Sequence, residues 1–190
     1  MSFDGGPASL AALDTCPVAG QALVRKIAEP VTIGELRTEQ VRANPEGHRY
    51  TVDNAYLAGE PGPLIASLAP AFTGLPTAKS FSLWFDLAHL PARPRPDMAL
   101  SLQTDIYFAT YVVGEREADD GACRTWVGDT MRRLEPFSPG CYLGDSDLRV
   151  RSARFMSDDA WRRFQDARAG WDPDRVLAGY PCADEALLNQ

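Results

Sequence analysis

The stretch of residues 100–113 alternates between two kinds of side chain, and this alternation constrains the fold more than any other feature of the sequence. Successive side chains of a β-strand point to opposite faces of a sheet. One apolar face and one polar face are typical of an antiparallel sheet with helices on one side. The apolar side carries Leu100, Leu102, Thr104, Ile106, Phe108, Thr110 and Val112, and the polar side carries Ser101, Gln103, Asp105, Tyr107, Ala109 and Tyr111.

The segments around this strand predict an α+β fold. Residues 48–57 and 80–88 are rich in aromatic and β-branched side chains, which predicts strands. Residues 63–72 have helical spacing, and Asp119 and Asp120 favour a helix start. With a short strand at residues 141–143, the order becomes strand, helix, strand, strand, helix, strand. This is the ferredoxin-like order, an antiparallel sheet with helices on one face.

The flanking segments predict further helices. Residues 1–44 form a helical N-terminal portion, with helices at residues 7–13 and 20–28 and a third capped by Thr32. Residues 45–145 hold the sheet and two helices. Residues 146–190 hold a helix at residues 157–169, capped by Ser157 and ended by Gly170, and a tail. A length of 190 residues favours a single domain, with a small N-terminal subdomain as the alternative.

The polar face of the predicted sheet is unusual in composition. In residues 80–88 the same alternation places Trp84 on it, beside Ser82 and Asp86. Plain exposure to water would explain the alternation alone. However, Trp84, Tyr107 and Tyr111 are poor choices for a solvated surface, and the Lys and Glu that usually coat one are missing. We therefore expect this face to be open to a ligand, a partner chain or a cofactor domain.

Composition excludes several classes of function. Lys and Arg number 19 against 26 Asp and Glu, a net charge of -7, which argues against binding to nucleic acid or to an anionic membrane. The four cysteines form no C-x-x-C pair, so we expect no metal site and a reducing compartment. The sequence has neither a stretch long enough to span a membrane nor a signal-peptide pattern, so we expect a cytoplasmic protein. No phosphate-cradling glycine motif occurs.

The C-terminal part carries a family resemblance. Residues 140–147 read Gly-Cys-Tyr-Leu-Gly-Asp-Ser-Asp, and a capped helix and then Trp171-Asp172-Pro173 with Leu177 follow. This series resembles the C-terminal, substrate-binding domain of berberine-bridge-enzyme-like FAD-linked oxidases, within the vanillyl-alcohol oxidase group. One departure is Tyr142-Leu143-Gly144, where family members commonly carry Tyr-x-Asn. The resemblance implies that FAD is held by a separate FAD-binding domain or chain, because the segment that resembles the family lacks that domain.

The resemblance also suggests site residues. Tyr142 matches the site tyrosine of the family and is the first candidate for handling a proton, with a packed strand tyrosine as the alternative. Asp105 is the second, as a mid-strand carboxylate that could act as a base, with a solvated carboxylate as the alternative. The candidates for the substrate-binding wall are Gln103, Tyr107, Trp84 and Tyr111.

Two hypotheses for the function remain open. In the first, the chain is the substrate-binding part of an FAD-dependent oxidoreductase that oxidises a small organic molecule, and it is inactive without its FAD-binding partner. In the second, it is a non-catalytic binding or assembly module, or a truncated orphan domain, that forms a homodimer through its sheet.

Overall fold

The structure is a computed structural model that describes residues 17–22, 29–87, 98–102 and 104–180. The chain divides into two compact units, Met1–Glu46 and Gly47–Gln190. The first contains the 3-10 turn η2 (Ala19–Gln21) and helix α2 (Ile33–Ala43). Thr32 caps α2 as predicted: its hydroxyl oxygen accepts from the Glu35 N–H at 3.2 Å, and the Glu35 carboxylate accepts from the Thr32 N–H at 2.7 Å. The helix predicted at residues 7–13 lies outside the described residues, as does most of 20–28.

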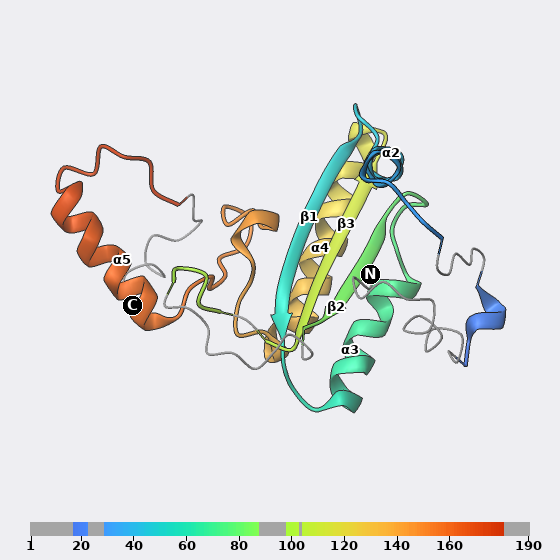
Figure 1. Cartoon of the computed structure of the whole chain (residues 1–190), viewed down its shortest axis with the longest axis horizontal. Helices are drawn as coiled ribbons and strands as arrows, with labels where there is room; N and C mark the ends of the chain where they lie inside the picture. Colours follow the sequence, from blue (N-terminus) through green and yellow to red (C-terminus); the bar gives the residue numbers. More distant parts are fainter. Residues whose placement is uncertain (1–16, 23–28, 88–97, 103, 181–190) are drawn as a thin grey trace. The chain divides into compact units, whose positions relative to one another are not determined.

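The second unit contains an antiparallel sheet of three strands, β1 (Arg49–Leu57), β2 (Phe81–Asp86) and β3 (Ile106–Gly114), in the order β1-β3-β2 (Figure 1). Helix α3 (Pro61–Thr73) connects β1 to β2, and helix α4 (Asp120–Leu134) follows β3. On the outer edge of β1, Tyr56 forms an antiparallel bridge with Gly140. The bridge occupies the place that the ferredoxin-like order gives to its last strand. The predicted α+β fold, with helices on one face of an antiparallel sheet, is confirmed.

The main hydrophobic core lies between α3, α4 and the sheet face that they cover, which we call the inner face. Phe108 is completely buried at its centre, and its ring meets the edge of the Phe72 ring at a centroid distance of 6.0 Å. The alternation of β3 explains this placement, because Phe108 and Val112 point to the same side. The buried members are Ala55, Leu57, Leu64, Leu68, Ala71, Phe108, Val112, Cys123, Val127, Met131 and Leu134.

A second hydrophobic cluster surrounds the start of helix α5 (Asp158–Trp171). Ser157 caps this helix as predicted, accepting from the Ala160 N–H at 3.3 Å. The helix ends at Trp171 rather than at Gly170. It stops there because the Asp172 carboxylate accepts from the N–H groups of Val176 and Leu177, at 2.7 and 3.1 Å, and turns the chain. The buried members of the cluster are Cys141, Leu148, Phe155, Met156 and Ala160.

Two predicted strands differ from the observed ones. The strand predicted at residues 100–113 begins at Ile106, because both partner strands end opposite that residue, at Leu57 and Asp86. The strand predicted at residues 141–143 is replaced by the Gly140 bridge and a 3-10 turn, η5 (Leu143–Asp145). Two more 3-10 turns, η3 (Glu117–Asp119) and η4 (Glu135–Phe137), flank α4. Within the described part of the chain, every helix is too short or too polar to cross a membrane.

Candidate functional site

The sheet face opposite the helices is the candidate site, and we call it the outer face. Paired residues of neighbouring strands have their side chains on the same face. Tyr107 is paired with Tyr56 and Phe85, and Tyr111 with Val52 and Phe81. The register therefore assigns to the outer face Tyr50, Val52, Asn54 and Tyr56 of β1, Phe81, Leu83 and Phe85 of β2, and Tyr107, Ala109, Tyr111 and Val113 of β3.

Aromatic rings line this face in stacked cross-strand pairs. The Phe81 and Tyr111 rings lie 4.9 Å apart at an angle of 12°, and the Phe85 and Tyr107 rings 6.1 Å apart at 22°. Phe85 keeps 53% of its surface exposed, so the side of the face formed by β2 presents a flat aromatic ring to its surroundings. Such pairs add about 0.5–1.5 kcal/mol beyond their buried area.

A carboxylate lies over the other side of the outer face. Asp145 Oδ2 accepts hydrogen bonds from the Tyr107 hydroxyl at 2.8 Å and from the Tyr111 hydroxyl at 3.1 Å. The Tyr142 ring stands edge-on to the Tyr107 ring at a centroid distance of 6.4 Å. Residues 142–146, which we call the covering loop, thus lie across the Tyr107 and Tyr111 hydroxyls. Beside it the Phe85 ring of β2 remains exposed, while Phe81 is half-buried.

The two tyrosine hydroxyls are weak acids in this environment. Burial raises the pKa of Tyr107 far above its usual value, and the hydrogen bond and charge of Asp145 raise it further. Burial and the charge of Asp145 raise the pKa of Tyr111 to about 12. Both phenols are therefore protonated at neutral pH and donate to Asp145. Each phenol oxygen can also accept a hydrogen bond from a ligand.

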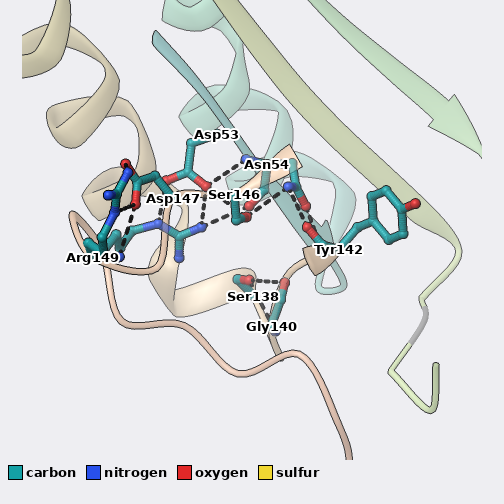
Figure 2. A network of polar contacts seen from close by, with 9 residues as sticks. Asp53, Asn54, Ser138, Gly140, Tyr142, Ser146, Asp147 and Arg149 are labelled. Carbon is teal, nitrogen blue, oxygen red and sulfur yellow. Dashed lines mark hydrogen bonds and ion pairs between the residues drawn. The ribbon is translucent and has the colours of Figure 1, made fainter. Parts of the chain in front are cut away.

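An amide side chain holds the covering loop against β1 (Figure 2). Asn54 Oδ1 accepts from the Tyr142 N–H at 2.7 Å, and Asn54 Nδ2 donates to the Tyr142 carbonyl at 2.8 Å and to the Ser146 hydroxyl at 2.9 Å. Asn54 is completely buried. A buried amide needs partners for its polar atoms, and the ends of the covering loop supply them.

An ion pair fixes the next turn of the chain. Arg151 donates to both carboxylate oxygens of Asp53, at 2.6 and 2.7 Å, and to the Asn54 carbonyl at 2.8 Å. Burial lowers the pKa of Arg151, but the hydrogen bonds and charge of Asp53 outweigh it, and the net pKa is raised. Arg151 is therefore charged at every physiological pH.

A hollow of about 310 Å³ borders the covering loop on the outer face. Its polar rim includes Asp145 and Asp147, and the Tyr111 ring forms part of its wall. This volume is at the lower end of the range for small-molecule sites. In the part of the chain that the structure describes, no group of three or more His, Cys, Asp or Glu side chains could hold a metal ion.

Three of the predicted site residues come together. Tyr107 and Tyr111 lie on the outer face as predicted, and the Tyr142 ring of the covering loop contacts the Tyr107 ring. The prediction that Tyr107 and Phe108 point to opposite faces is confirmed by the burial of Phe108 against the helices.

Three other predicted residues are not brought to this site by the described structure. Trp84 is paired with Phe108, so its side chain lies on the inner-face side, and its assignment to the polar face was wrong. Asp105 is exposed and precedes β3, so its predicted mid-strand position was also wrong; its carbonyl accepts from the Leu87 N–H. Gln103 lies outside the described residues.

The sequence analysis missed Asn54, Asp53, Arg151 and Asp145. One signal was present: Asp53 and Asn54 sit side by side inside a strand, although strands are depleted in both residue types. A buried polar pair in such a place needs partners, and those partners are distant in sequence.

Comparison with known proteins identifies relatives of the chain. FAD-linked oxidoreductase nodO from Hypoxylon pulicicidum is 28% identical over 141 residues, which cover 74% of this chain and 31% of that protein. The chain is similar to FAD-linked oxidoreductases. FAD-linked oxidoreductase janO from Penicillium janthinellum is 27% identical over 146 residues, covering 75% of this chain and 32% of the relative. FAD-linked oxidoreductase ptmO from Penicillium ochrochloron is 24% identical over 148 residues, covering 78% and 33%.

The chain thus spans about a third of the length of these FAD-linked oxidoreductases. No family model and no solved structure matches it. The predicted relationship to FAD-linked oxidases is confirmed at this level. The finer assignment, to the substrate-binding domain of the berberine-bridge-enzyme-like group, stays a prediction.

Proposed function

We propose that this chain is the substrate-binding part of an FAD-dependent oxidoreductase that acts on a small organic molecule. In this proposal the outer face forms one wall of the active site, and another domain or chain holds the FAD. The observation that carries the proposal is the sequence similarity to about one third of several FAD-linked oxidoreductases. The aromatic outer face, with the Asp145 carboxylate hydrogen-bonded to Tyr107 and Tyr111, supports the placement of the site.

The residues of the outer face fit one side of a flavin and not its phosphates. The exposed Phe85 ring and its stacked neighbour Tyr107 offer a flat surface to a planar ring system or an aromatic substrate. The outer-face residues include no Lys or Arg, and Asp145 adds negative charge beside them. A diphosphate needs cations or a helix N-terminus, which the partner would have to provide.

The chemistry of oxidation would come from the flavin, which takes up a hydride from the substrate. The residues of this chain would bind the substrate and move its proton. A substrate hydroxyl that donates to Tyr107 Oη can lose its proton to that oxygen while Tyr107 passes its own proton to Asp145 Oδ2. Tyr111 would hold Asp145 in place, and the Tyr142 ring would limit how the substrate lies on Tyr107. Asp145 thereby takes the role that the sequence suggested for Asp105.

The test is co-expression of this chain with the FAD-domain reading frame nearest its own gene, followed by affinity capture of this chain. We expect the captured complex to absorb between about 350 and 500 nm, as flavoproteins do, and the chain captured alone to be colourless. A coloured preparation of the chain alone would show that the cofactor site lies in this chain. Capture without any flavoprotein would contradict the proposed partnership.

A pair of matched variants tests whether the outer face is the contact surface. Phe85→Asp places a charge on the exposed outer-face ring, and Ile65→Asp places one on α3, where Ile65 is 60% exposed. We expect Phe85→Asp to abolish capture of the flavoprotein and Ile65→Asp to preserve it. Equal behaviour of the two variants would argue against contact through the outer face.

Variants of the proton path test the residue roles in the captured complex. Loss of a proton acceptor typically slows turnover by 10² to 10⁴, so we expect a fall of about that size for Asp145→Asn and for Tyr107→Phe. We expect Asp105→Asn to change turnover little. The reverse result, with Asp105→Asn inactive and Asp145→Asn active, would restore the assignment made from the sequence.

Self-association is the second candidate function, and the exposed Phe85 ring also supports it. In that case the outer face would cover the same face of a second copy. Sedimentation of the purified chain over a range of concentrations separates the two candidates. A dimer that Phe85→Asp converts to a monomer would favour self-association, and a monomer at all concentrations would exclude it.

A further inference from the structure

The inference concerns Asn54 of β1, which lies two residues before Tyr56. Tyr56 joins the segment that follows α4 to the sheet, through its bridge to Gly140. The Tyr56 N–H donates to the Gly140 carbonyl at 2.9 Å. Two residues before Tyr56 and two residues after Gly140, the side chain of Asn54 faces the backbone of Tyr142. Its amide bonds both the N–H and the carbonyl of Tyr142, as a residue of a neighbouring strand would do. The Asn54 side chain thus makes the hydrogen bonds that a paired backbone would make at this position.

The same amide also holds the far end of the covering loop. Asn54 Nδ2 donates to the Ser146 hydroxyl at 2.9 Å, and that hydroxyl donates in turn to Asp53 at 3.2 Å. Tyr142 and Ser146 are the residues on either side of the turn η5, and Asp145 lies inside it. Figure 2 shows Asn54 reaching both of them. One side chain therefore fixes both ends of the turn that carries the carboxylate.

The Tyr142 ring contacts the turn that its own backbone begins. A Cβ atom added to Gly144 would lie 2.7 Å from Cε1 of the Tyr142 ring, so the ring packs directly on the backbone of the turn. Asp145 reaches Tyr107 and Tyr111 from this turn. A shift of the Tyr142 backbone would move the ring, the turn and the carboxylate together.

We propose that Asn54 is the positioning residue of the outer-face site. Its amide sets the register of the covering loop on β1 and thereby places the Asp145 carboxylate between the Tyr107 and Tyr111 hydroxyls. This inference names a residue that supports the proposed function, and it rests on that function for its catalytic meaning. The geometric part concerns the chain alone and can be tested without flavin or partner.

The experiment follows the two tyrosine hydroxyls by NMR of the full chain labelled with an isotope at the tyrosine Cζ, over a pH titration. Tyr107→Phe and Tyr111→Phe assign their signals among the six tyrosines. In the unaltered chain we expect both signals to titrate well above the usual tyrosine pKa of about 10. In Asn54→Ala, with Asp145 displaced, we expect both midpoints to fall by about one pH unit, since a hydrogen bond to a charged group is worth that much.

Further variants separate positioning from simple destabilisation. Asn54→Asp keeps the size and the acceptor for the Tyr142 N–H but loses both donated hydrogen bonds. Ser146→Ala removes only the far anchor, and we expect a smaller shift in the same direction. Thr130→Val is the matched control, because Thr130 is a buried polar residue of α4 away from the loop. We expect it to leave both midpoints unchanged even where it lowers stability.

The outcome is decisive in either direction. Lower midpoints in Asn54→Asp and Ser146→Ala, with Thr130→Val unchanged, support the positioning role, whether or not Asn54→Ala folds. Unchanged midpoints in folded Asn54→Asp and Ser146→Ala overturn it. Failure of flavoprotein capture contradicts the proposed function and leaves the NMR result standing, so the two failures can be told apart.

Discussion

Asp53 and Arg151 form a bidentate ion pair between residues 98 positions apart in the sequence, with Arg151 Nε 2.6 Å and Nη2 2.7 Å from the two carboxylate oxygens. Asp53 is 7% exposed, and the side chain of Arg151 retains 27%. The pair joins β1 to the turn that follows the covering loop. Its removal should therefore affect both stability and the outer face.

Arg151→Met should lower the free energy of unfolding by about 2–3 kcal/mol, because it leaves the buried Asp53 carboxylate without its partner. Urea unfolding followed by circular dichroism measures this change. Arg149→Met is the matched control, since Arg149 pairs with Asp147 on the exposed surface, and it should leave the midpoint nearly unchanged. Equal effects of the two substitutions would contradict the structural role of Arg151.

Stability should fall above pH 10 because of Tyr107 and Tyr111. Their pKa values are raised in the folded chain, to about 12 for Tyr111, whereas an unfolded tyrosine titrates near 10. The stabilising contribution is complete below pH 10 and is lost as the pH rises toward the folded pKa, because the unfolded state releases its protons first. Urea midpoints between about pH 9 and 12 should fall less steeply in Tyr107→Phe/Tyr111→Phe than in the unaltered chain. Parallel curves would argue against the raised pKa values of the two phenols in the folded chain.

Gly144→Ala should displace the Tyr142 ring, since the new methyl group would lie 2.7 Å from it. The Tyr142 ring is 40% exposed and can turn aside, so we expect a small loss of about 0.5–1.5 kcal/mol from a strained rotamer. Gly128→Ala offers the opposite case: a Cβ there meets nothing within 4 Å inside α4, so the variant should gain about 0.5–1 kcal/mol from helix propensity. A stabilising Gly144→Ala would show that the ring and the turn are not in contact.

Two thiols should be inaccessible in the folded chain. The side chains of Cys123 and Cys141 are buried, at 5% and 0% exposure, and burial raises the pKa of Cys123. In a Cys16→Ser/Cys182→Ser variant, a thiol reagent should react slowly in buffer and rapidly in denaturant. Rapid reaction in buffer would contradict the packing of the core cluster around Cys123 or of the α5 cluster around Cys141.

The elements that depend on local pattern were predictable from the sequence. The caps Thr32 and Ser157 lie within three residues of their partners, and the opposite directions of Tyr107 and Phe108 follow from strand geometry. Trp84 was not predictable in this way. Alternation separates the two faces of a strand but does not say which face is inside, and β2 carries large apolar side chains on both.

The position of the covering loop could not be predicted from the sequence either, for a different reason. Asn54 bonds Tyr142 and Ser146 across 88 and 92 positions, and no spacing rule connects them. The start of β3 is a similar case. Alternation continues from residue 105 back to residue 100, but β1 and β2 end opposite Ile106, and the hydrogen bond from the Leu87 N–H to the Asp105 carbonyl lies outside the paired strands.

Side-chain contacts of β1 take the place of a fourth strand. This limits which substitutions the sequence can accept during evolution. A backbone ladder tolerates most substitutions, because every residue type except proline brings the same N–H and carbonyl groups. The junction between β1 and residues 140–151 instead depends on the identities of Asn54, Asp53 and Arg151. Homologues that lose one of the three should have replaced the others as well.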